Sequence, residues 1–361
     1  MNFLLSGYYG YANAGDEAVL AAILEALASR VPAHTQFVVT SGNPERTVSL
    51  HNSPQHRVAA IPRQHPQALL QAMRACDVFI SGGGSLLQDV TSLRNVVYYT
   101  SLMRLARLSR KPLMIYAQGV GPLKKSLSQK LARAAIQGAR IVTVRDPDSK
   151  ALLERIGVRR AIEVTADPVW ALECGVRSAE CGAKDKSVGI WCAALRSWLH
   201  VENASEQAAS MFKAVFGAAR AAGAKVEFLP MQPPSDGPLT EENFKLYADA
   251  QDSILDTVNL HPRDIMAQTG QANLMLGMRL HALIFAAAQG VPCVAVNYDP
   301  KVEALAQLIG APLLQSEDFR SDHAVRKVAD AVQAARPPDA ALITELKAKA
   351  LRNADLAVSL M

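Results

Sequence analysis

Short apolar runs alternate with longer helix-forming segments along this 361-residue chain, and the alternation limits its possible folds more than any other feature. The runs are rich in Val, Ile, Leu and Phe, and they end close to Gly, Ser, Asp or Asn. This pattern is typical of βαβ units, in which helices join parallel strands. In the first half we expect strands at residues 2–5, 36–40, 78–80, 113–117, 141–144 and 162–165. The sequence therefore predicts an α/β fold built on parallel sheets.

The alternation restarts after a stretch of weaker periodicity that contains Pro168, Gly175 and Gly182. In the second half we expect strands at residues 187–193, 225–229, 253–255, 274–276 and 291–296, and a helix around 241–250. At roughly 150 residues per domain, the length fits two domains, and one large α/β domain with insertions is the alternative.

We therefore predict two Rossmann-like domains facing a cleft. The expected parts are an N-terminal domain on the acceptor side (1–170), a linker (171–186), a C-terminal domain on the donor side (187–338), and a C-terminal helix (339–361) packing back across the junction. In such folds ligands bind at the carboxyl ends of the strands, so functional motifs should follow strands directly.

Composition and charge exclude several other classes of protein. Half of the residues are hydrophobic, 20% are charged and 6% are aromatic, which argues against disorder and against a coiled coil. The net charge of +5 is mild for a nucleic-acid-binding protein, so we expect no nucleic-acid partner.

The five cysteines and the N-terminal sequence bear on location. The cysteines are scattered and none forms C-x-x-C, so neither a disulfide framework nor a structural zinc site is indicated. The first residues show no basic region and no long apolar region of a signal peptide. The most apolar stretch, 282–296, is interrupted by Gln289, Gly290 and Pro292 and is too short to span a bilayer. We expect a cytoplasmic protein whose membrane contact is at most peripheral.

The first motif, GYYGYANAGDEA from Gly7, directly follows the first expected strand. Its glycine spacing, G-x2-G-x4-G, matches neither the dinucleotide fingerprint nor the Walker A loop. Asp16 can cap the helix that follows, and Glu17 lies in its first turn. An ordinary strand-to-helix turn is the alternative interpretation, but three tyrosines favour sugar binding because tyrosine offers both a stacking face and a hydroxyl.

The second motif, SGGGSLLQD from Ser81, also follows an expected strand. Three consecutive glycines leading into a helix would expose backbone N–H donors to an anion or to sugar hydroxyls. Gln88 and Asp89 add polar groups one turn further on, although both are also suited to capping and turn roles.

Two further polar groups follow strands. AQGVGP starts at Ala117, and Arg145-Asp146 follows the strand from Ile141. Each places a small or polar residue on the expected ligand side, although Arg145 and Asp146 can equally form a local ion pair and helix cap.

The fourth motif, GMRLHALIFA from Gly277, is the most informative. Arg279 and His281 at a helix N-terminus combine a bidentate cation, a titratable donor and the positive end of the helix dipole, which together favour an anionic ligand. A histidine satisfied by backbone groups is the structural alternative. Arg196 follows the expected strand 187–193, and Lys301 follows the strand 291–296. This density of cations suits a small ligand that carries both phosphate and carboxylate.

These motifs resemble the polysaccharide pyruvyltransferase family, most closely its bacterial cell-wall members of the CsaB type. The matching stretches lie in family order over roughly residues 1–310. They read SGYYGYANAGDEA, SGGGSLLQD, YAQGVGP, VRDPDS, VTADPVWAL, LRSW, GMRLHALIFAAAQGVP and YDPKVEAL. The resemblance implies a two-domain glycosyltransferase-B-like fold and transfer of pyruvate from phosphoenolpyruvate to a sugar of a lipid-linked cell-wall polymer precursor. The sugar is typically a β-linked N-acetylmannosamine, the product is a 4,6-ketal of a polymer that anchors an S-layer, and neither metal nor cofactor is expected.

Residue roles follow from the resemblance. The donor-binding Arg-Leu-His of the family falls on Arg279, Leu280 and His281, and its strand-end arginine falls on Arg196. The strand before Arg196 is longer than the family spacing between Val-Gly and Arg. With Lys301 added, these residues form the expected donor site. The residues expected to contact the acceptor are Tyr11, Asn13, Gly83, Gly84, Gln88, Gln118 and Arg145.

The chemistry of the donor agrees with this assignment. Phosphoenolpyruvate carries about three negative charges, which arginines, a histidine and helix-terminal amides can neutralise and orient. We hypothesise that His281 protonates the methylene carbon or the leaving phosphate, and that Arg279 and Arg196 hold phosphate and carboxylate. The acceptor base is then Asp16, Glu17 or Asp89.

A basic stretch between Arg94 and Arg140 holds ten Lys and Arg and no acidic residue. The helix expected at 93–109 interleaves these cations with Tyr98, Leu102 and other apolar residues, a pattern typical of peripheral contact with an anionic membrane. A solvated helix face is the alternative.

Two other functions compete with pyruvyl transfer. A nucleotide-sugar glycosyltransferase would share the two-domain plan, with Glu303 available for a ribose. A non-catalytic anion- or glycan-binding relative is the other candidate. A dinucleotide oxidoreductase is disfavoured because G-x-G-x-x-G follows none of the expected strands.

Overall fold

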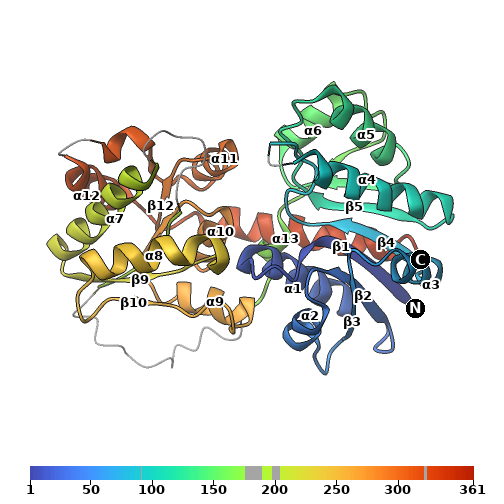
Figure 1. The fold of residues 1–361 in the computed structure, drawn as a ribbon, viewed down its shortest axis with the longest axis horizontal. Coiled ribbons are helices and arrows are strands. Elements are labelled where there is room, and N and C mark those ends of the chain that lie inside the picture. Colours follow the sequence, from blue (N-terminus) through green and yellow to red (C-terminus); the bar gives the residue numbers. More distant parts are fainter. Residues whose placement is uncertain (91, 175–188, 197–203, 321–322) are drawn as a thin grey trace. The chain divides into compact units, whose positions relative to one another are not determined.

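The computed structural model describes residues 1–90, 92–174, 189–196, 204–320 and 323–361 (Figure 1). The chain divides into two units. The first consists of residues 1–11, 16–172 and 345–361, and the second of residues 12–15 and 173–344. Most of the expected linker, from residue 175 on, lies outside the described residues, as do Cys181 and the residues directly after Arg196.

The first unit is built on a seven-stranded parallel sheet in the order β3-β2-β1-β4-β5-β6-β7. Its strands are β1 (Asn2–Tyr9), β2 (Gln36–Ser41), β3 (Arg57–Pro62), β4 (Val78–Gly82), β5 (Leu113–Gln118), β6 (Ile141–Val144) and β7 (Glu163–Val164). Its helices are α1 (Ala14–Ala28), α2 (Pro44–His51), α3 (Pro66–Ala75), α4 (Leu93–Leu108), α5 (Ser126–Ile136) and α6 (Pro147–Arg155), and the short 3₁₀ helix η1 (Pro168–Ala171) follows β7. The strand order reverses beside β1, which is where ligands bind in folds of this kind.

Strand β3 is the one strand of this sheet that the sequence pattern did not predict. It reads RVAAIP, with two alanines where larger β-branched residues would signal a strand, and it ends in Pro62. It lies at the edge of the sheet and is mostly exposed, and an edge strand can accommodate a proline. The central strands β4 and β5 are buried along their whole length, which explains their continuous apolar sequences.

The second unit holds a six-stranded parallel sheet in the order β10-β9-β8-β11-β12-β13. Its strands are β8 (Gly189–Ala194), β9 (Ala224–Phe228), β10 (Ser253–Ile254), β11 (Leu274–Gly277), β12 (Cys293–Val296) and β13 (Leu313–Leu314). Its helices are α7 (Ala204–Ala221), α8 (Pro233–Tyr247), α9 (Pro262–Thr269), α10 (Leu280–Ala288), α11 (Pro300–Ile309) and α12 (Ala324–Ala334), with a 3₁₀ helix η2 (Ser316–Phe319). Stacked rings of Phe212 and Phe228, with centroids 5.0 Å apart, lie in its core.

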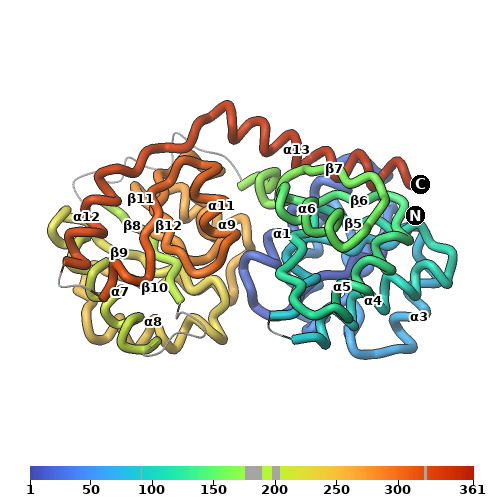
Figure 2. The backbone as a smooth tube through the Cα atoms, turned by 90° about the horizontal axis from the view of Figure 1, so that it is seen from above, coloured from blue at the N-terminus to red at the C-terminus, as the bar shows by residue number. Residues whose placement is uncertain are grey.

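The C-terminal helix α13 (Ala340–Val358) contributes to the first unit from Glu345 onward. Asn353 on this helix is fully buried, and its side-chain oxygen accepts hydrogen bonds from Thr143 at 2.6 Å and Thr165 at 3.0 Å. Figure 2 shows this part of the helix running beside β7 and β6. The last residues of the chain are thus fixed to the carboxyl ends of two strands of the first sheet.

None of the described helices is both long enough and apolar enough to cross a bilayer. Among the described residues, Cys76, Cys174, Cys192 and Cys293 form no disulfide bond.

Candidate active site

The predicted donor residues lie at the carboxyl ends of adjacent strands in the second unit. Arg196 follows β8, Arg279 follows β11 and Lys301 follows β12, and these three strands are neighbours in the sheet. Direct contacts connect the strand ends. The backbone N–H of Arg196 points to the Met278 sulfur at 3.4 Å, and the Arg196 guanidinium lies 4.9 Å from the centre of the Tyr298 ring. The sheet therefore brings the predicted cations together at the carboxyl ends of its strands.

Arg279 is held by a buried carboxylate that sequence reasoning missed. Its Nε donates to Asp236 Oδ2 at 3.0 Å, and its Nη2 contacts Asp236 Oδ1 and the Ser235 hydroxyl, the latter at 3.0 Å. Gln232 lies 3.5 Å from the same nitrogen. The Asp236 side chain is 2% exposed and that of Arg279 is 13% exposed. Among the described residues Nη1 has no hydrogen-bond partner, so one side of the guanidinium is left for a ligand.

Asp236 escaped sequence reasoning because helix α8 begins earlier than the pattern suggests. The helix was expected around 241–250, but it starts with Pro233 and Pro234 and contains a third proline at Pro238. The missed signal is PPSD, which is separated by three residues from the end of an expected strand, because proline is favoured in the first turn of a helix. That start places Asp236 in the first turn, where the backbone N–H of Gln232 donates to it at 3.0 Å.

His281 lies in the first turn of α10, next to the glycine loop 12–15 of the second unit. Arg279 is the N-cap of this helix, so the amides of Leu280 and His281 have no acceptor within it. The Leu280 side chain is buried. A Cβ atom at Gly15 would collide with Nδ1 of His281, and the Ala14 N–H bonds the Met231 carbonyl at 2.7 Å. The absence of a side chain at Gly15 therefore makes room for the imidazole.

Lys301 occupies a less enclosed position. Its ammonium lies 3.3 Å from Asp299, the N-cap of α11, and its side chain is 37% exposed. Such a surface ion pair adds little stability, so the ammonium can exchange partners when an anion arrives.

The start of helix α1, after the loop that follows β1, is capped by a different residue than expected. The helix begins at Ala14, and Asn13 caps it by accepting the Gly15 N–H at 3.0 Å, so Asp16 is not the cap. Glu17 is buried and bound at both oxygens, to the Gly10 N–H at 2.8 Å and to His51 Nε2 at 2.9 Å. These bonds hold the loop in place.

The triple glycine does not lead into a helix, which corrects the expected anion-binding arrangement. Gly83 and Gly84 both have φ of +69°, and the next helix, α4, begins only at Leu93. A side chain at Gly83 would overlap Val19, and one at Gly84 would lie 2.8 Å from Asp16 Oδ1. The glycines therefore allow close packing against α1 and bring the backbone up to the Asp16 carboxylate.

Asp89, at the end of the SGGGSLLQD motif, is hydrogen-bonded to the segment that directly follows AQGVGP. It is 5% exposed, and its oxygens accept the backbone N–H groups of Lys124 at 2.8 Å and Lys125 at 2.7 Å. Burial acts to raise the pKa of Asp89, but these hydrogen bonds outweigh it and the pKa is lowered. The carboxylate stabilises a loop and is a weak proton acceptor.

Of three other expected acceptor residues, the side chains of Arg145 and Gln88 are bound to other parts of the protein, whereas that of Gln118 is not. Arg145 is buried and donates to Asp167 and to Ser85, both at 2.8 Å. Gln88 accepts from the Val90 N–H at 3.0 Å. Gln118 is fully buried, and its amide has no hydrogen-bond partner among the described residues.

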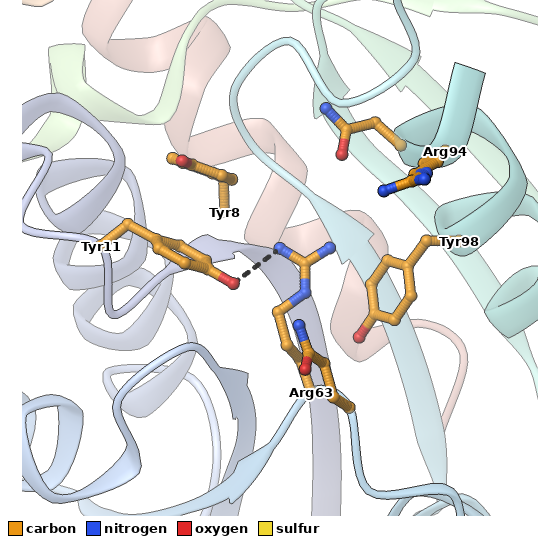
Figure 3. A pocket seen from close by; sticks show the side chains of 7 residues that line it. Tyr8, Tyr11, Arg63, Arg94 and Tyr98 are labelled. Carbon is orange, nitrogen blue, oxygen red and sulfur yellow. Dashed lines mark hydrogen bonds between the residues drawn. The ribbon is translucent and has the colours of Figure 1, made fainter. Parts of the chain in front are cut away.

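Tyr11 does line a pocket, together with residues that were not predicted. The cavity of about 310 Å³ is bordered by Tyr8, Tyr11, Arg63, Gln64, Arg94, Asn95 and Tyr98 (Figure 3). Arg63 follows the unexpected strand β3, which is why sequence reasoning missed it.

The basic stretch is amphipathic, but its apolar side faces the core. Tyr99, Leu102 and Met103 of α4 are buried, and Tyr98 and Leu105 pack against the same cluster. The expectation that these side chains face a membrane is therefore wrong. The exposed face of α4 and α5 carries cations with a few apolar residues, including Leu108, which is 71% exposed, and Leu127, which is 51% exposed.

Solved structures similar to this chain establish its fold class. A UDP-GlcNAc 2-epimerase from Methanocaldococcus jannaschii is 13% identical with a TM-score of 0.63, covering 99% of each chain. A putative UDP-N-acetylglucosamine 2-epimerase from Listeria monocytogenes is 12% identical with a TM-score of 0.62, covering 98% of this chain and 94% of that one. At these identities the likeness concerns the fold alone, and it confirms a two-domain α/β fold of the glycosyltransferase-B type. No curated protein sequence matches the chain.

The family follows from the sequence. The family model described as polysaccharide pyruvyl transferase matches residues 13–300. The chain therefore belongs to the polysaccharide pyruvyl transferase family and is a transferase enzyme, as its motifs predicted. None of the described His, Cys, Asp and Glu residues form a group of three or more suited to a metal ion.

Proposed function

We propose that the protein transfers pyruvate from phosphoenolpyruvate to N-acetylmannosamine in a lipid-linked cell-wall polysaccharide precursor, forming a 4,6-ketal. The observation that carries this proposal is the group at the strand ends of the second unit, which consists of the cations Arg196, Arg279 and Lys301 together with His281. Because Asp236 pairs with Arg279 and Asp299 pairs with Lys301, the ligand that this group favours is a compact anion bound by Arg196 and by the remaining donors of the two paired cations.

The donor is assigned by charge and geometry. Asp236 fixes the Arg279 guanidinium through Nε and Nη2, which leaves Nη1 directed to the ligand. The amides of Leu280 and His281 at the start of α10 add donors for a phosphate or carboxylate oxygen. Arg196, stacked on Tyr298, supplies the second planar cation. No metal or cofactor is needed for this neutralisation.

The reaction consumes two hydroxyls of the sugar and releases phosphate. The methylene carbon of phosphoenolpyruvate takes up a proton and becomes the methyl group. One sugar hydroxyl bonds to the adjacent carbon and the second hydroxyl replaces the phosphate there, which closes the ketal. The two hydroxyl protons balance the proton gained by carbon and the one carried off by phosphate. In the proposal His281 delivers the proton to carbon.

The acceptor base is best assigned to Asp16. Glu17 and Asp89 were the other candidates, but Glu17 is buried against His51, and both oxygens of Asp89 accept backbone hydrogen bonds. Asp16 is partly exposed beside the backbone of Gly84. Tyr8, which lines the pocket of the first unit, has a raised pKa. Burial of Tyr8 is the larger cause, and the negative charge of Asp16 is the next.

A lipid-linked acceptor fits the exposed face of α4 and α5. Nine of the ten cations between Arg94 and Arg140 are exposed, five of them on α4 and α5 and the others in the segments that flank these helices, and this stretch of sequence contains no acidic residue. Such a surface attracts anionic lipid headgroups, and exposed Leu108 and Leu127 add apolar contact. We propose peripheral contact with the inner face of the membrane through this surface.

Calorimetric titration tests the donor assignment against a nucleotide-sugar glycosyltransferase. Wild-type protein should bind phosphoenolpyruvate at least about tenfold more tightly than UDP-sugars, and Arg279→Ala should lose that binding. Arg220→Ala, which removes an exposed arginine of the same unit, is the matched control. Preferential binding of a UDP-sugar, or full donor affinity in Arg279→Ala, would remove the donor assignment.

A further inference from the structure

The pocket of the first unit contains an arginine in an unusual setting. Arg63 is only 9% exposed, and its guanidinium carbon lies 4.1 Å from the centre of the Tyr98 ring and 5.6 Å from that of Tyr11. Figure 3 shows the guanidinium between these two rings, with Nη1 3.5 Å from the Tyr11 hydroxyl. The Arg63 backbone N–H is bound to the Ser41 carbonyl at 2.9 Å, which fixes the start of the side chain.

No carboxylate of the described residues forms an ion pair with Arg63. Buried charges in proteins are normally paired, because removing a charge from water is costly. Tyrosine rings recover part of this cost through cation–π contact, but they do not neutralise the charge. The buried cation next to a cavity therefore favours an anion inside that cavity.

The other walls of the pocket narrow the choice of anion. Arg94, in the first turn of α4, adds a second cation at the exposed side, and that turn contains no acidic residue. Tyr8 and Tyr11 are stacked with ring centres 4.4 Å apart and present aromatic surface to the cavity. Gln64 and Asn95 supply neutral donors and acceptors of the kind that bind hydroxyl groups.

The size of the cavity limits the ligand further. A volume of about 310 Å³ lies at the lower end of the ~300–1,000 Å³ range of small-molecule pockets. It suits one sugar ring with one charged substituent rather than an oligosaccharide.

We propose that this pocket binds a hexose that carries an oxyanion, either a phosphate ester or a carboxylate, as the charged part of the acceptor. Arg63 holds the oxyanion, Arg94 supports it at the rim, and the tyrosines pack against the sugar ring. This inference rests on the proposed function for its role in catalysis, since it places an acceptor element in the first unit. The donor site belongs to the second unit, so the two assignments can fail independently.

Calorimetric titration of the intact protein tests the inference with four probes: glucose 1-phosphate, glucuronate, glucose and inorganic phosphate. At least one of the two charged hexoses should bind about tenfold or more tightly than both glucose and inorganic phosphate. Preference between glucose 1-phosphate and glucuronate identifies the oxyanion. Arg63→Met should weaken the preferred probe by about tenfold or more, and Arg94→Gln should weaken it less because that side chain is exposed.

Controls separate a binding role from a structural one. Arg74→Gln removes an exposed arginine at the end of α3, in the same unit, that does not line the pocket, and it should leave binding unchanged. Arg63→Lys keeps the charge without the planar fork and should bind at an intermediate level, so the test survives if Arg63→Met does not fold.

The outcomes distinguish this inference from the proposed function. Equal binding of glucose and both charged hexoses, or unchanged binding of the charged probe by a folded Arg63 variant, would overturn the pocket assignment. Arg63→Met should bind phosphoenolpyruvate as wild type does, and a parallel loss of donor binding would also overturn it. Failure of the wild-type protein to bind phosphoenolpyruvate would instead contradict the proposed function.

Discussion

Asp236 determines the geometry of Arg279, and the pair can be tested as a unit. Asp236→Asn keeps the shape of the side chain but removes the charge that binds Nε and Nη2. We expect kcat/KM for phosphoenolpyruvate to fall by about tenfold or more, because the guanidinium loses its fixed orientation. Urea denaturation should show a free energy of unfolding lowered by about 3 kcal/mol, since a largely buried charge loses its partner.

Asp249→Asn is the matched control for this prediction. Asp249 pairs with Arg220 in the same unit, but its side chain is 51% exposed. Its loss should change neither kcat/KM nor stability measurably. If Asp236→Asn behaved like this control, Arg279 would not depend on its buried partner.

Gly15 is predicted to control the position of His281. Gly15→Ala places a methyl group against the imidazole Nδ1, so the ring must move. We expect kcat to fall by about tenfold or more, because a displaced general acid loses most of its effect. The methyl group would also lie 2.9 Å from the His281 Cβ, so the start of α10 must shift as well, and thermal unfolding should show a loss of stability of about 1–3 kcal/mol.

Gly237→Ala provides the comparison within α8. A Cβ at Gly237 would have no heavy atom within 4 Å, so that variant should keep wild-type turnover. Wild-type kcat in Gly15→Ala would show that His281 tolerates displacement and would argue against its role as the acid.

Among the connecting elements, we make a prediction for the loop that Asp89 holds: its contribution to the free energy of unfolding should depend on pH. Because the pKa of Asp89 is lowered below its ordinary value of 3.8, its contribution to stability is fully present above that value. The contribution is lost as the pH falls through the folded-state pKa. Asp89→Asn should therefore be less stable than wild type by about 2 kcal/mol at pH 5–8.

Thermal unfolding of the two proteins across pH measures this difference. The gap between wild type and Asp89→Asn should be constant above about pH 5 and narrow below about pH 4. A gap that stays constant down to pH 3 would mean that the charge of Asp89 does not hold the loop.

The exposed face of α4 and α5 gives a prediction at the level of surface elements. Arg104→Glu combined with Arg107→Glu reverses two exposed charges on α4 while leaving its buried side intact. We expect co-sedimentation with phosphatidylglycerol vesicles to fall strongly, at about 1 kcal/mol per charge removed near the surface. Phosphatidylcholine vesicles should bind neither protein, and equal binding to both vesicle types would contradict peripheral electrostatic contact.

Sequence patterns predicted those elements whose signals are local. Buried strands such as β6 show continuous β-branched runs, and its predicted and observed bounds agree at Ile141–Val144. Edge strand β3 has two alanines and a proline, so it gives no such signal, and Arg63 was missed with it. Helix α8 starts at Pro233, eight residues before the expected start, so Asp236 was missed as well.

The sequence predicted the positions of individual polar residues in the fold better than it predicted their roles. The motifs put Asp16, Glu17 and Asp89 near strand ends, as the structure does, but only contacts distinguish them. Glu17 meets His51, which lies 34 positions away along the chain, and Asp89 meets amides 35 and 36 positions away. A local sequence pattern cannot show contacts between residues that lie this far apart along the chain.

At the scale of the whole molecule, the proposed reaction is the transfer of pyruvate from phosphoenolpyruvate to the acceptor sugar. In the proposed reaction each unit supplies one half of the substrate binding: the second unit binds the donor at its cationic strand ends, and the first binds the acceptor in its tyrosine-lined pocket. Incubating wild-type protein with phosphoenolpyruvate and a synthetic lipid-linked disaccharide ending in β-N-acetylmannosamine tests both halves together. Phosphate release and the product are then followed in one sample, by a colorimetric assay and by NMR.

We expect one phosphate to be released per sugar modified, and a new ketal methyl signal linked to positions 4 and 6 of the N-acetylmannosamine. Arg279→Ala should abolish both signals together. Phosphate release without a ketal, or sugar transfer from a UDP-sugar under the same conditions, would contradict the proposed reaction.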